Sequence, residues 1–111
     1  MSRYKQTYIL TTELIQSFEA LKYAANTLKH VVMEVDHQQY KIKVMTSTGL
    51  FSYGEIVHMN LIKTKDYLKL EIESENGDAG FIDFNINKRN VNKVYRYFNR
   101  YLERKNGGIN V

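Results

Sequence analysis

The sequence predicts an α+β fold, in which an antiparallel β-sheet of about five strands carries two helices on one face. Apolar residues recur at helical spacing near the start of the chain and again near its end. Between these segments, β-branched and aromatic residues alternate with polar ones in four stretches. The expected element order is therefore β-α-β-β-β-β-α. Helices at both ends of a strand meander favour two layers, with both apolar stripes covering the sheet.

The first strand is expected over residues 3–10, which are rich in Tyr, Thr and Ile. Thr11 or Thr12 is placed to cap the helix that follows, whose first turn contains Glu13. We expect this helix over residues 12–28 because apolar side chains repeat there every three or four residues. These side chains are Leu14, Phe18, Leu21, Ala25 and Leu28.

Four strands are expected next, at about residues 31–36, 40–45, 55–63 and 67–74. In the last of them Lys69, Glu71 and Glu73 alternate with apolar residues, as in a strand with one buried and one solvated face. Short turns between the strands indicate antiparallel neighbours. Residues 81–84 are a candidate for a further short strand, and Gly107 and Gly108 end the final helix.

Composition indicates one globular domain spanning residues 1–111, of which 43% are hydrophobic and 25% charged. Residues 106–111 are expected to form a flexible tail. Cysteine is absent, which excludes disulfides and thiol chemistry. The chain begins without the apolar segment of a secretory signal and has no apolar run of membrane-spanning length. We therefore expect a cytoplasmic location, with a peripheral membrane role left open.

Charge is concentrated at the C-terminal end. Residues 85–111 carry seven basic residues and one acidic residue, a net charge of +6, whereas the whole chain is +4. Five of these basic residues recur at steps of three or four, which brings them to one face of the final helix. They are Arg89, Lys93, Arg96, Arg100 and Arg104. The opposite face is apolar, with Val91, Val94, Tyr95, Phe98 and Leu102.

Two segments carry a family resemblance: Phe51-Ser52-Tyr53-Gly54-Glu55 and Asp83-Phe84-Asn85-Ile86-Asn87-Lys88-Arg89-Asn90-Val91. They resemble small, uncharacterised bacterial β-α-β(4)-α domains, in which a Ser-Trp-Gly-Glu turn precedes one strand and an Asp-Trp-Gly-Lys-Asn segment opens the final helix. Tyr53 and Phe84 stand where tryptophan is usual, and Asn85 replaces the glycine. The element order also resembles the TATA-binding-protein-like and helix-grip folds. These resemblances imply a shared fold and no particular chemistry.

The two motifs are interpreted as structural. Gly54 is expected to adopt a backbone conformation that a β-carbon would penalise, next to Tyr53 at the edge of the core. Asp83 and Asn87 are expected to cap the final helix. The alternative is an anion site that this helix start forms with Lys88 and Arg89.

Catalytic patterns are not found, so the sequence indicates no enzyme and no cofactor. Glu71 and Glu73 share a strand face, which is the expected solvated face. No histidine lies at metal-ligand spacing from another, and no phosphate-binding glycine loop is present.

We therefore expect a non-enzymatic binding module that contacts anionic lipid headgroups through Arg89, Lys93, Arg96, Arg100 and Arg104. One alternative is binding to nucleic-acid phosphates, with Tyr97 and Tyr101 available for stacking, although this partner is less favoured. Others are an acidic protein partner, a ligand pocket of helix-grip type, and a solvated face that only keeps the protein soluble. Phe18, Leu21 and Phe98 are expected to fill the space that such a pocket would need. Oligomeric state is left open.

Overall fold

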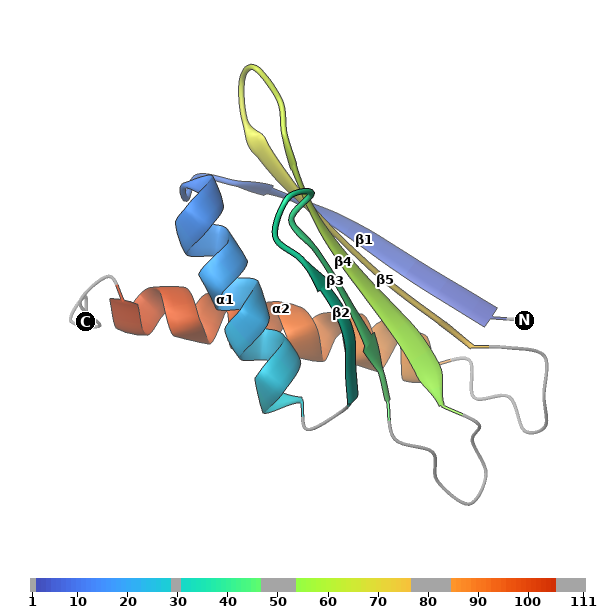
Figure 1. The fold of residues 1–111 in the computed structure, drawn as a ribbon. Helices are drawn as coiled ribbons and strands as arrows, with labels where there is room; N and C mark the ends of the chain where they lie inside the picture. Colours follow the sequence, from blue (N-terminus) through green and yellow to red (C-terminus); the bar gives the residue numbers. More distant parts are fainter. Residues whose placement is uncertain (1, 29–30, 47–53, 77–84, 106–111) are drawn as a thin grey trace.

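The computed structural model describes residues 2–28, 31–46, 54–76 and 85–105. The seven elements follow the predicted order: β1 (Ser2–Leu10), α1 (Leu14–Thr27), β2 (Val31–Asp36), β3 (Lys41–Met45), β4 (Glu55–Lys63), β5 (Leu68–Asn76) and α2 (Ile86–Lys105). The predicted α+β class is confirmed, because five antiparallel strands form one sheet and both helices cover one face of it (Figure 1). The candidate strand at 81–84 and the tail at 106–111 lie outside the described residues.

The strands are arranged in the order β1-β5-β4-β3-β2. The first strand of the chain therefore lies beside the last, with Ser2 opposite Asn76 and Leu10 opposite Leu68. Helix α1 connects the two outer strands, β1 and β2. Within β2, the register against β3 shifts between Val32 and Glu34. The start of α2, which follows β5, is hydrogen-bonded to β5 and β4.

The two helices cover different parts of the same sheet face. Helix α2 lies against β5, β1 and β4, whereas α1 lies against β4 and β3 and packs on α2 (Figure 1). The alternation of β4 and β5 explains the core, because every second side chain is buried along both strands. Phe18 and Leu21 of α1 and Phe98 of α2 are buried against these strands, as the sequence predicts. These three side chains occupy the space that a ligand pocket of helix-grip type would need.

Helix α1 begins two residues later than predicted, and the capping role expected for Thr11 or Thr12 is wrong. The N-cap residue is Glu13, which forms no side-chain capping bond. The Thr12 hydroxyl instead lies 2.6 Å from the Ser17 hydroxyl. Because Ser17 is fully buried on α1, this bond satisfies a hydroxyl that would otherwise be unpaired in the core.

The turn between β2 and β3 depends on two residues. Asp36 Oδ1 accepts hydrogen bonds from the backbone N–H groups of Gln38 and Gln39, both at 2.9 Å. Tyr40 then has a φ of 58°, in the left-handed region that disfavours side chains. Its ring packs edge-on against Phe18 with centroids 5.3 Å apart, and this contact helps to offset the backbone cost.

Candidate functional site

Helix α2 separates its charges from its apolar residues as predicted. Its buried residues are Asn87, Asn90, Val91, Val94, Phe98 and Leu102. The five predicted anion-binding residues, Arg89, Lys93, Arg96, Arg100 and Arg104, are all exposed. At 3.6 residues per turn, they fall within an arc of roughly 80° on the side away from the core. We call this surface the basic face; its anion-binding role stays a prediction.

The centre of the basic face is not neutralised. In the described part of the chain, no carboxylate forms an ion pair with Lys93, Arg96 or Arg100. The Arg100 guanidinium lies 5.2 Å from the centre of the Tyr97 ring, and Arg104 donates a 3.3 Å hydrogen bond to the Tyr23 hydroxyl. These contacts orient the two side chains and leave their charge unopposed.

The two tyrosines considered for base stacking are engaged in packing. Tyr97 and Tyr101 are both half-buried and pack against the core. Tyr101 also contacts the Tyr23 ring at a centroid distance of 5.4 Å. Neither ring stands out from the basic face as a free platform, so this surface offers positive charge rather than aromatic stacking.

The acidic residues of β5 lie on the other face of the sheet and are paired. Glu73 lies 3.3 Å from Arg3, and Glu71 lies 3.6 Å from Lys5. Both are diagonal pairs between the neighbouring strands β1 and β5. Glu75 lies 2.9 Å from His58 Nε2 on β4. Glu71 and Glu73 thus share a partly solvated face, as predicted, and each contacts a cation. The side of the molecule opposite α2 is therefore largely self-neutralised.

A buried polar network fixes the first turns of α2. The Asn90 amide donates to Glu55 Oε1 and to Ser74 Oγ, each at 3.1 Å. Glu55 also accepts from the Thr46 hydroxyl at 2.9 Å, and the Ser74 hydroxyl donates to Asn87 Oδ1 at 2.8 Å. Because these bonds are directional, they set how α2 is rotated on the sheet and so which way its basic face points.

Three residues of the two motifs, Glu55, Asn87 and Asn90, belong to this network. Gly54 has a φ of 90°, a conformation that a β-carbon would penalise, as predicted. Glu55 follows directly and is 4% exposed. Asn87, expected as a helix cap, is fully buried and bonds to Ser74 on β5. Lys88 and Arg89, the residues of the alternative anion site, are exposed. Tyr53 and Asp83 lie outside the described residues.

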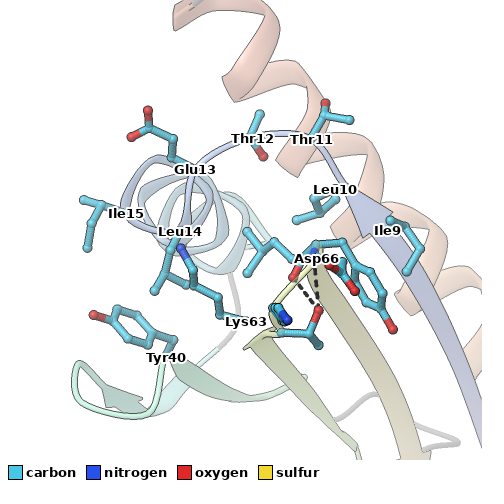
Figure 2. A pocket seen from close by; sticks show the side chains of 14 residues that line it. Ile9, Leu10, Thr11, Thr12, Glu13, Leu14, Ile15, Tyr40, Lys63 and Asp66 are labelled. Atoms are coloured by element: carbon cyan, nitrogen blue, oxygen red, sulfur yellow. Dashed lines mark hydrogen bonds between the residues drawn. The ribbon is translucent and has the colours of Figure 1, made fainter.

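A second feature lies at the other end of the strands. A cleft of about 920 Å³ opens between the end of β1, the first turn of α1 and the β4–β5 turn at residues 64–67, and Tyr40 closes one side (Figure 2). We call it the hairpin cleft. No pattern in the sequence pointed to it, because its walls come from three separate stretches of the chain, residues 9–15, Tyr40 and residues 63–68.

The described residues contain neither a metal-binding group of side chains nor a membrane-spanning helix. Those residues include no group of three or more His, Asp or Glu side chains placed to hold a metal ion. None of the helices they form has both the length and the apolar character needed to cross a membrane.

The fold has known relatives in structure. No protein-family model matches the chain, and no curated protein matches it. The crystal structure of Ara h 8.0201 superposes with a TM-score of 0.60 at 8% identity, over 91% of this chain and 97% of that one. The di-domain ARO/CYC StfQ from the steffimycin biosynthetic pathway gives a TM-score of 0.53 at 9% identity, over 95% of this chain and 52% of that one. The chain therefore spans about half of StfQ. These similarities show a helix-grip-like α+β fold.

Proposed function

We propose that this domain is a non-enzymatic binding module whose basic face docks on anionic lipid headgroups. One observation carries the proposal: five cationic side chains are exposed on one side of α2 while the other side is buried in the core. Each Lys or Arg near an anionic membrane surface contributes about 1 kcal/mol to attachment. Five such residues are enough for a reversible, salt-sensitive association.

Preorganisation supports the same function. Val91, Val94 and Phe98 are fully buried, and Asn90 is bonded to β4 and β5. The helix therefore cannot rotate or unwind without breaking the core. Its cations are held together before any surface is met, so little conformational entropy is lost on docking.

A lipid surface fits better than nucleic acid. Single-stranded nucleic acid is usually held by charge together with stacked aromatic rings. Because Tyr97 and Tyr101 are packed against the core, the basic face supplies only the first of these. A headgroup layer requires only charge. An anionic inner leaflet facing the cytoplasm is the surface that we propose, in keeping with the cytoplasmic location expected from the sequence.

The non-enzymatic part of the proposal is supported by the contacts of the acidic side chains. Glu71 and Glu73 lie beside Lys5 and Arg3, and Glu55 bonds to Thr46 and Asn90 in the core. These are contacts that hold elements together. The resemblance of the sequence segments 51–55 and 83–91 to a family of small bacterial domains is likewise part of the proposal.

Vesicle flotation tests the proposal. We expect the protein to float with vesicles of phosphatidylcholine and phosphatidylglycerol, less so at higher salt, and to stay unbound with phosphatidylcholine alone. The double variant Arg96→Gln, Arg100→Gln should bind about thirtyfold more weakly, because two contributions of about 1 kcal/mol are lost. A matched control, Lys41→Gln with Lys43→Gln on β3, removes the same charge from the other face and should bind as the unchanged protein does.

Equal binding to neutral and anionic vesicles, or binding to neither, would overturn the proposal. Tighter binding to a 20-nucleotide single strand than to anionic vesicles at the same salt would assign the face to nucleic acid. An acidic partner protein would be indicated by a different result. The Arg96→Gln, Arg100→Gln variant would then capture less of an acidic protein in a pull-down than the Lys41→Gln, Lys43→Gln variant does, while the two variants bind anionic vesicles equally.

A further inference from the structure

The hairpin cleft is built from both layers of the fold. Leu10 at the end of β1 and Leu68 at the start of β5 lie opposite each other in the sheet, and Leu14 opens α1 above them. Its volume of about 920 Å³ falls within the usual range of ligand pockets, roughly 300–1,000 Å³. It lies at the end of the strands away from the buried polar network and takes no part in the basic face.

Exposed apolar side chains gather around this cleft. Ile9 is 60% exposed, Ile15 is 61% exposed and Tyr67 is 43% exposed, and all three line it. Figure 2 labels Ile9 and Ile15. They come from β1, α1 and the β4–β5 turn, so the fold and not one local run of sequence brings them together. A concave apolar surface left open to water favours a ligand with an apolar body.

Two of the hydroxyl groups that line the cleft already have partners within the protein. The Thr64 hydroxyl donates to the Tyr67 carbonyl at 2.9 Å and accepts from its N–H at 3.1 Å. The Thr12 hydroxyl lies 2.6 Å from Ser17. The Thr12 and Thr64 hydroxyls are therefore engaged before any ligand arrives.

The charged groups have a different arrangement. Lys63 extends from the end of β4 across the cleft toward the first turn of α1, whereas the Glu13 carboxylate points away from it (Figure 2). Lys65 also lines the cleft, and Asp66 on the same turn is the remaining carboxylate. No ion pair involves either lysine in the described part of the chain. The local balance favours a negative group.

We propose that the hairpin cleft binds an amphipathic monoanion, with an apolar body lying against Leu10, Leu14 and Ile15 and an anionic head next to Lys63. A straight-chain carboxylate is the simplest molecule of this class. This site is separate from the basic face, because it uses no residue of α2, and it stands whether or not that face binds lipid.

The test uses dodecanoate below its micelle-forming concentration, with the isoleucine methyl groups of the protein followed by NMR. We expect saturable shifts at Ile9 and Ile15. Dodecanol, which has the same chain without the charge, should bind more weakly, and dodecyltrimethylammonium more weakly still. Asp66→Asn should strengthen dodecanoate binding, because it removes the carboxylate beside the lysines.

Two variants separate the head from the body of the ligand. Lys63→Gln should weaken dodecanoate binding about fivefold, the effect of one partly exposed ion pair, and leave dodecanol binding unchanged. Ile15→Glu should abolish binding of both. Ile15 is exposed and lies in the first turn of a helix, where an acid is favourable, so this variant should fold normally.

Controls keep the result specific to the cleft. Lys41→Gln, at an exposed lysine of β3, should not change dodecanoate binding. The Arg96→Gln, Arg100→Gln variant should also bind dodecanoate normally, and loss of binding there would place the anion on α2 and overturn the inference. Equal affinity for dodecanoate and dodecyltrimethylammonium, or an unchanged affinity in Ile15→Glu, would overturn it as well.

Discussion

The side-chain amide of Asn90 bonds to Glu55 on β4 and to Ser74 on β5, at 3.1 Å in each case. One residue of α2 thereby ties together two neighbouring strands, and all three side chains are buried. Apolar packing alone allows a helix to rotate slightly about its axis. Paired hydrogen bonds restrict this rotation, because they depend on direction. The direction of the basic face is therefore set inside the core.

Removing this amide should destabilise the fold. Asn90→Ala leaves Glu55 and Ser74 without one buried partner each, which costs about 1–3 kcal/mol in the free energy of unfolding. Urea denaturation measures the loss. Asn92→Ala, an exposed asparagine of the same helix, is the matched control and should change the free energy by less than about 0.5 kcal/mol. Equal losses in the two variants would contradict a structural role for the network.

The filled space between sheet and α2 leads to a second prediction. Phe98 is fully buried, and Phe98→Ala should cost about 3–5 kcal/mol because it removes apolar contacts and leaves a cavity. Phe98→Leu keeps most of the volume and should cost much less. These values come from the same denaturation measurement. A loss below about 1 kcal/mol for the alanine variant would show that this part of the core is not closely packed.

Tyr8 should make the protein sensitive to alkaline pH. Its ring stacks on Tyr95 at 3.7 Å, and burial, together with the charges of Tyr95 and Tyr4, raises the pKa of Tyr8 to about 12. The unfolded chain loses this proton near pH 10, so the contribution to stability is complete below pH 10 and is lost as pH rises toward about 12.

Denaturation at several pH values and ultraviolet titration of the tyrosines together check this. Tyr8→Phe should remove an ionisation step near pH 12 and flatten the fall of stability above pH 10. Tyr67→Phe, at an exposed tyrosine, should leave both unchanged. An ionisation step near pH 12 that survives in Tyr8→Phe would refute the assignment.

The β2–β3 turn should respond to acid. Hydrogen bonds from the Gln39 and Gln38 N–H groups lower the pKa of Asp36 below its ordinary value. A lowered folded-state pKa means that the stabilisation is present above the unfolded value near 3.9 and is lost as pH falls through the folded value. NMR titration of the Asp36 carboxyl should give a midpoint below 3.9. In Asp36→Asn, unfolding should depend less on pH in this range, and a midpoint above 3.9 would contradict the two bonds.

The element order could be predicted because each segment carries a strong period. In β4 and β5 apolar residues occupy every second position, and the third predicted strand, 55–63, matches β4. The ends of the elements could not be predicted in the same way. Thr12 has the chemistry of a helix cap, yet it bonds to Ser17 instead, because tertiary contacts decide between two local partners of similar strength.

The site was predictable only where it lies on a single element. The basic face follows from spacing along α2, whereas the hairpin cleft needs the strand order, which brings Leu10 beside Leu68. The buried network has one signal in the sequence. Asn87 and Asn90 each precede a buried valine of the apolar stripe by four residues, so both continue that stripe toward the helix start. Polar residues in phase with a core stripe indicate buried hydrogen bonds.

The register shift in β2 has a consequence for how copies of this protein behave when crowded together. A regular outer strand is a template on which another chain can add, and repeated addition leads to cross-β fibrils. Between Val32 and Glu34 the spacing of β2 is irregular, so an incoming strand would find its backbone partners out of step. The β2 edge of the sheet is thereby protected against the addition of a further strand.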